Sequence, residues 1–99
     1  MTVMNVVHMR VKPGKDEEYL AIHRDFQSTS RPKGNRSFRV LKTGDRAYCI
    51  IGEWDDMDAL VAARPAMIAN LDRIRPLLED LGGGRGVTDP HSGEVVVSG

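Results

Sequence analysis

Two histidines are the side chains of this sequence best suited to proton transfer. His23 falls between Tyr19 and Phe26 at helical spacing, on the predicted inner side of a helix. His8 lies in the middle of a predicted strand. Either imidazole could act as a general base near neutral pH, because its ordinary pKa is about 6.5. His23 could instead be a histidine at the edge of the core that only hydrogen-bonds to backbone, and His8 could equally contact a second subunit.

A second group of candidates alternates along one face of a predicted strand over residues 46–54. Tyr48, Ile50, Gly52 and Trp54 share this face, so two aromatic rings flank a residue without a side chain. A flat aromatic ligand could fill the gap and stack on the rings, with Phe26 as a further contact. Core packing around a glycine that a helix approaches closely would give the same pattern, so both interpretations stay open.

The sequence predicts neither a metal site nor an organic cofactor. The three histidines lie in separate predicted elements without the spacing of metal ligands. Cys49 is the single cysteine and has apolar neighbours, which indicates a buried thiol and fits a reducing cytoplasm. The glycine-rich residues 82–86 follow a predicted helix instead of opening one, so a phosphate-binding loop is not expected.

Length and charge indicate one small domain over residues 1–99 with no affinity for nucleic acid. Fourteen basic and fourteen acidic residues balance, which removes a general attraction to polyanions or anionic membranes. Residues 31–46 are locally basic, and this could attract an anionic or phenolate substrate or simply form a solvated sheet edge. No apolar run reaches about 18 residues, so neither a membrane span nor a secretory leader is predicted.

The first half of the chain predicts a strand, a helix and a hairpin. Residues 3–12 form the strand, which ends at Pro13-Gly14 because proline lacks a ladder N–H. Residues 15–28 form the helix, with carboxylates in its first turn. Residues 37–42 and 46–54 are strands joined at Gly44-Asp45.

The second half predicts one long helix and a last strand. Asp55 is the expected N-cap, Pro65 and Pro76 are expected to kink or break the helix, and glycines 82–84 end it. Residues 94–98 are rich in valine and predict the last strand. The residues expected on the buried helix face are Met57, Leu60, Val61, Arg64, Met67, Ile68, Leu71, Ile74 and Leu78.

This order of elements predicts an α+β fold, the ferredoxin-like β-α-β-β-α-β sandwich with strand order 4-1-3-2. The strands over residues 3–12 and 46–54 are apolar on both faces, yet two helices can cover only one face of the sheet. We therefore expect a homodimer in which the two open sheet faces meet.

Three short motifs resemble the antibiotic biosynthesis monooxygenase family. They are Pro13-Gly14-Lys15 after the first strand, Gly52-Glu53-Trp54-Asp55 at the end of the third, and Thr88-Asp89-Pro90 followed by Ser92-Gly93. The resemblance covers nearly the whole chain in the order and length of its elements. It implies a dimeric α+β barrel with a pocket between sheet and helices in each subunit. Some members oxidise aromatic polyketides or quinols with O2 and no cofactor, others degrade haem, and many have no assigned reaction.

The resemblance carries over to few single residues. Trp54 matches a pocket tryptophan of the cofactor-independent oxygenases, whereas Ile50 stands where they have asparagine and Leu60 where they have tyrosine. Haem-degrading members use an asparagine on the first strand, and Val7 lies nearer that position than Asn5. They also use a tryptophan and a histidine on the second helix, which has neither here, so haem degradation is not expected.

Two functions follow as hypotheses. The first is a cofactor-independent monooxygenase acting on a small aromatic or quinoid substrate, with His23 or His8 as base and Trp54 and Tyr48 orienting the substrate in a dry pocket. Ile50, Phe26 and Leu60 would complete the wall of that pocket. The alternative is a non-catalytic dimer that binds a small ligand or has a structural role, which the incomplete catalytic set favours.

Overall fold

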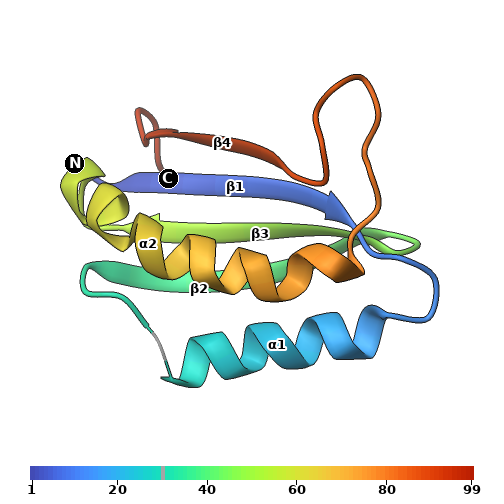
Figure 1. Ribbon diagram of the computed structural model, residues 1–99. Coiled ribbons are helices and arrows are strands. Elements are labelled where there is room, and N and C mark those ends of the chain that lie inside the picture. Colours follow the sequence, from blue (N-terminus) through green and yellow to red (C-terminus); the bar gives the residue numbers. More distant parts are fainter. Residues whose placement is uncertain (30) are drawn as a thin grey trace.

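Two helices lie side by side on one face of a four-stranded sheet (Figure 1). The computed structural model describes residues 1–29 and 31–99. The elements are β1 (Val3–Arg10), α1 (Asp16–Thr29), β2 (Asn35–Gly44), β3 (Ala47–Trp54), α2 (Met57–Ile74), a short 3-10 helix η1 (Arg75–Leu77) and β4 (Asp89–Glu94). The predicted ferredoxin-like fold is confirmed. Within the described residues, no helix combines the length and apolarity that a membrane crossing needs.

The sheet is antiparallel throughout, with the order β2-β3-β1-β4, which is the predicted order. The two strands that are apolar on both faces, β1 and β3, therefore lie in the middle. Their register places Asn5 opposite Gly52 and Val7 opposite Ile50, while Phe38 on β2 pairs with Gly52 from the other side. Side chains alternate along strands, so these residues share the face that the helices cover.

The core consists of two separate clusters of buried side chains under the helices. One gathers around Tyr19, Tyr48 and Ile74, near the beginning of α1. The other packs Trp54 against Leu60 and near Val3, at the end of β3. A discontinuous core of this kind leaves room between its two parts.

The predicted buried face of α2 is partly wrong. Val61 and Ile68 are 47% and 53% exposed, and Arg64 is also exposed. The buried residues are Leu60, Ala63, Asn70 and Ile74, spaced by three, seven and four positions along one narrow stripe. The prediction combined apolar residues from both sides of this stripe into one face that was too wide.

The ends and continuity of α2 also differ from the prediction. Asp56, not Asp55, is the N-cap, and its Oδ1 accepts a hydrogen bond from the Ala59 amide at 2.8 Å. The helix continues through Pro65 to Ile74 without a break, and the chain changes to a 3-10 turn only around Pro76.

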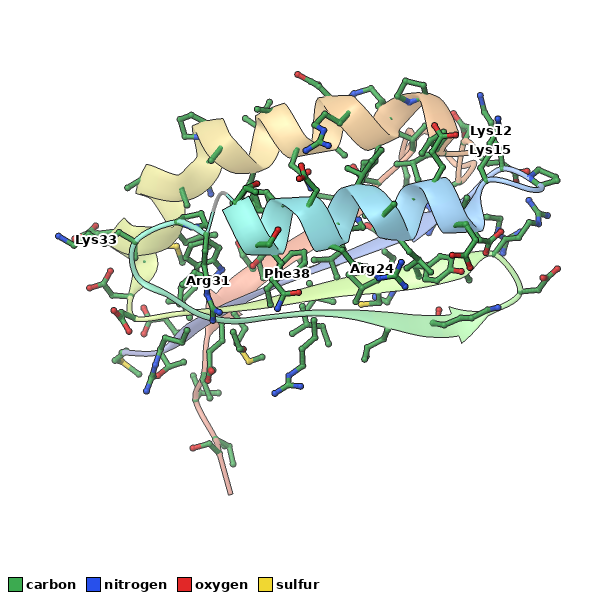
Figure 2. The ribbon with its side chains drawn as sticks, turned by 90° about the horizontal axis from the view of Figure 1, so that it is seen from below. Lys12, Lys15, Arg24, Arg31, Lys33 and Phe38 are labelled. Atoms are coloured by element: carbon green, nitrogen blue, oxygen red, sulfur yellow. The ribbon has the colours of Figure 1, made fainter. Side chains whose placement is uncertain are left out.

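The predicted last strand, residues 94–98, is wrong. The strand is β4, which pairs with β1 through Pro90 opposite Val7 and Ser92 opposite Asn5. Pro90 is tolerated because β4 is an edge strand, where a missing N–H costs no ladder bond. Val96 and Val97 are almost fully exposed, and Figure 2 shows the chain end leaving the sheet on the side away from the helices. High β-propensity alone did not make these valines a strand, because they do not pair with a neighbouring strand of the described sheet.

Candidate functional site

A cavity of about 450 Å³ lies between the sheet and the two helices. The volume is in the range of small-molecule sites. All four strands and both helices contribute side chains, and Trp54, Leu60 and Ile74 connect the cavity to both parts of the core. No carboxylate is among the described residues that line it. The lining is mostly apolar, so each of its few polar atoms has a large effect on which ligand fits.

A hydrogen bond between neighbouring strands fixes one of these polar groups. The indole Nε1 of Trp54 donates to Oδ1 of Asn5 at 2.7 Å. Because Oδ1 is already engaged, the amide Nδ2 of Asn5 is the atom left to donate to a ligand. Among the described residues, no other hydrogen bond of the Asn5 side chain is found.

Gly52 makes this bond possible. It lies directly opposite Asn5 in the ladder, and a Cβ at this position would be 2.4 Å from Asn5 Oδ1 and 2.9 Å from Trp54 Nε1. Real Cβ atoms do not approach other atoms so closely, so any side chain at position 52 would displace one of the two partners. The glycine is therefore required by the contact above it.

His23 and Asn70 place a second polar group in the cavity, from α1 and α2. His23 Nδ1 lies 3.5 Å from Asn70 Nδ2. The imidazole packs edge-on against Tyr19, with ring centroids 4.5 Å apart, and lies 5.8 Å from the ring of Phe38. Burial lowers the pKa of His23 to about 4, so the imidazole is neutral at physiological pH.

The cavity brings together five of the seven residues named from the sequence, which are His23, Phe26, Ile50, Trp54 and Leu60. Phe26 contacts Phe38 on β2, with ring centroids 5.8 Å apart. Figure 2 shows Phe38 between α1 and the sheet.

Tyr48 and His8 lie outside this cavity. The Tyr48 hydroxyl donates to Asp16 Oδ2 at 2.5 Å, at the beginning of α1, and this bond raises the pKa of Tyr48 to about 12. Its ring packs on Tyr19 in the core. His8 is exposed on the sheet face that carries no helix. Both border a second cleft, of about 440 Å³ and lined by several charged residues, at the other end of the sheet.

The polar residues Asn5 and Asn70 were not predicted as site residues. Each interrupts an apolar row, Asn5 between Val3 and Val7 on β1 and Asn70 between Ala63 and Ile74 on α2. A search for apolar periodicity passes over such residues, yet a polar residue at a buried position is the informative observation. A polar residue within an apolar row was therefore the sequence signal that could have identified Asn5 and Asn70.

The mouth of the cavity carries positive charge. Arg31 and Arg64 line it and are exposed, and Figure 2 shows Arg31 where the chain passes from α1 towards β2. Among the described residues, no cluster of three or more His, Cys, Asp or Glu side chains could hold a metal ion. The described site therefore combines aromatic and aliphatic surfaces with amide, imidazole and hydroxyl side chains and the two guanidinium groups of Arg31 and Arg64.

The family model for antibiotic biosynthesis monooxygenase matches residues 2–65. No curated protein matches the sequence. Among solved structures, a conserved protein from Methanosarcina mazei has a TM-score of 0.78 at 16% identity, covering 95% of this chain and 92% of its own. SnoaB, a cofactor-independent oxygenase from Streptomyces nogalater, has a TM-score of 0.76 at 19% identity, covering 98% and 95%. A protein of unknown function from Nitrosomonas europaea has 0.76 at 14%, covering 99% and 92%. At these identities the structural likeness shows the fold alone.

We predict that Gly52→Ala destabilises the protein by roughly 1–3 kcal/mol, because the added methyl overpacks the Asn5–Trp54 contact. Chemical denaturation measures the loss, and the indole N–H resonance of Trp54 should shift as its hydrogen bond breaks. Gly93→Ala is the matched control, since nothing lies within 4 Å of the added Cβ, and it should change stability by less than about 0.5 kcal/mol. Equal effects of the two substitutions would contradict the proposed reason for the glycine.

We also predict that His23 makes the protein less stable in acid. Its pKa is about 4 when folded and near 6.5 when unfolded, so between these values the unfolded chain binds the extra proton. The contribution of His23 is therefore unchanged above pH 7 and falls by roughly 3 kcal/mol as the pH drops from 6.5 to 4. Urea unfolding from pH 4 to 7 should show a shallower pH dependence for His23→Leu. His8→Gln controls for the loss of a histidine on the exposed face, and an unchanged slope in His23→Leu would refute the prediction.

Proposed function

This chain belongs to the antibiotic biosynthesis monooxygenase family, and from that premise we propose that it oxidises a small aromatic or quinoid substrate in its cavity with O2 and no cofactor. The observation that carries the proposal is the Asn5 amide, held by Trp54 in a cavity whose lining surface is mostly apolar. The similar fold of SnoaB, described as a cofactor-independent oxygenase, supports the proposal of a reaction without a cofactor.

The proposed reaction needs no reductant besides the substrate. An electron-rich phenolate or enolate passes electrons to O2, and the oxygen combines with the activated ring carbon. For a ring CH2 group, one oxygen atom becomes a new carbonyl, and the other leaves as water with the two hydrogens of that CH2. The protein must then stabilise the substrate anion, hold the ring and exclude water.

Asn5 is placed to stabilise the substrate anion. Its Nδ2 can donate to an oxyanion, and the bond from Trp54 to Oδ1 fixes the amide in advance, so little reorganisation is needed during the reaction. The Trp54 indole and the Phe38 ring offer flat surfaces for an aromatic substrate. Arg31 and Arg64 at the mouth would favour entry of an anion.

The two histidines contribute differently to this proposal. His8 lies on the other sheet face and takes no part. His23 lines the cavity, but its lowered pKa makes it a weaker base than an exposed histidine. We therefore propose a substrate that ionises readily by itself, such as an anthrone or a hydroquinone, with His23 acting through hydrogen bonding.

A second candidate function is binding without turnover. Ile50 and Leu60 contribute only apolar side chains to the cavity, so neither of them adds a donor to the Asn5 amide. A ligand carrier or sensor needs no more than that. A ligand that raises the melting temperature of the protein and is recovered unchanged would favour this alternative.

We predict O2 uptake above the uncatalysed rate with at least one member of a panel of anthrones and hydroquinones. Asn5→Leu should lower kcat by roughly 100- to 1,000-fold, as expected for loss of an oxyanion donor. Val61→Ala, on the exposed side of α2 and outside the cavity lining, should leave the rate unchanged. An oxygen electrode measures all three proteins. The proposal fails if wild type shows no uptake, or if Asn5→Leu matches it.

We further propose that a second copy covers the open sheet face and forms a dimeric α+β barrel. Both helices lie on one side of the sheet, and no helix of the described residues covers the other side (Figure 2). The uncovered face carries Val6 paired with Ile51, and the 44% exposed Leu41 paired with Cys49. The apolar side chains at the centre of this face are best covered by the same face of a second chain.

We predict a dimer at micromolar concentration, which light scattering after size-exclusion chromatography measures. Ile51→Lys should shift the protein towards the monomer, because it places two charges in the paired face. Val61→Lys makes a comparable change on the exposed side of α2 and should leave the dimer intact. A monomeric wild-type protein, or a fully dimeric Ile51→Lys, would rule out this interface.

A further inference from the structure

His23 and Asn70 are more deeply buried than their hydrogen bonding explains. Their side chains lie against each other, and the residues are 3% and 8% exposed. Within the described part of the chain, His23 Nε2 and Asn70 Oδ1 have no hydrogen-bond partner. Both residues line the 450 Å³ cavity. Buried polar atoms without partners are rare in native proteins, so two of them on neighbouring residues that line one cavity call for an explanation, and a bound ligand group would supply one.

The pair offers one donor and one acceptor, whichever way its atoms are assigned. With a neutral imidazole, one ring nitrogen carries a proton and the other accepts. If Asn70 Nδ2 donates to His23 Nδ1, then the Nε2–H is a free donor and Oδ1 a free acceptor. If the amide is turned over, Nδ1–H donates to Oδ1, which leaves Nε2 as acceptor and Nδ2 as donor.

We propose that His23 and Asn70 form a subsite for a hydroxyl group of the bound ligand. A hydroxyl accepts and donates at once, so it can satisfy both free groups. A carboxylate or a bare carbonyl could accept from the donor but would leave the acceptor unsatisfied. The rings of Tyr19 and Phe38 beside His23 fit a hydroxyl carried by an aromatic ring.

This inference rests on the proposed function, because it uses the same cavity, and it narrows the substrate class. Asn5 lies on β1, whereas His23 and Asn70 lie on the two helices above the sheet. The ligand then carries two oxygens, the reacting one at Asn5 and a second, phenolic one at the helix pair. A hydroxylated anthrone or a dihydroxylated arene has this pattern.

Three naphthalenes with one varied substituent test the subsite. The probes are 2-naphthol, which donates and accepts, 2-methoxynaphthalene, which only accepts, and 2-methylnaphthalene, which does neither. Binding is measured without oxygen by quenching of Trp54, the single tryptophan, and by calorimetry. We expect wild type to bind 2-naphthol at least tenfold more tightly than the methoxy compound. Because both can accept from Asn5, this ratio reports donation by the ligand to the helix pair.

The double variant His23→Leu/Asn70→Leu should reduce the ratio to less than about twofold. It replaces two unsatisfied polar groups with apolar ones of similar size, so it should fold, and thermal melting checks this. Should it not fold, Asn70→Leu alone serves for the same comparison. Met67→Leu, which lines the cavity without a hydrogen-bonding group, should change all three affinities together. Equal affinities in wild type, no binding of any probe, or an unchanged ratio in the variant overturns the inference.

The same data separate this inference from the proposed reaction. Oxygen uptake without a hydroxyl preference would preserve the function and remove the subsite. A hydroxyl preference that depends on the helix pair, without oxygen uptake on any substrate, would preserve the subsite and remove the function.

Discussion

The hydrogen bond from Trp54 to Asn5 is the constraint on which the rest of the site depends. It joins the two central strands above Gly52, and it exists only because the register places Asn5 opposite a residue without a side chain. A shift of one residue between β1 and β3 would turn Asn5 to the other sheet face. The orientation of a single amide in the cavity is thus tied to the pairing of the whole sheet.

The topology could be predicted because it follows from strong, redundant signals. Two strands apolar on both faces must lie in the middle of the sheet, and the order of elements leaves few connections. The errors in the predicted last strand and helix cap arose where the local preference of a residue differed from what strand pairing and backbone geometry selected. The exposed valines at the chain end have the higher β-propensity, yet the segment around Pro90 pairs with β1. Likewise Asp55 and Asp56 are chemically equal as caps, and only the backbone geometry selects Asp56.

The site was predictable where it follows from a shared face and not where it depends on a single polar atom. Trp54 and Ile50 reach the cavity by strand alternation alone. Tyr48 shares that face, but the first turn of α1 covers its end of the sheet and binds its hydroxyl through Asp16. That contact joins residues far apart in the sequence, so no local pattern contains it. A search that counts apolar residues likewise does not identify Asn5 and Asn70, because both are polar.

The position of β4 has a consequence for the order in which the molecule can be built. The β2–β3 hairpin is local in sequence, whereas β1 completes its second edge only with residues 89–94, more than eighty positions later. Contacts of such long separation form slowly, and on the ribosome they wait until residues 89–94 have been made. Ser92 and Pro90 form part of the cavity wall, so a nascent chain has the cavity open on this side until β4 has emerged and paired with β1. Binding competence is therefore the last property that this fold acquires.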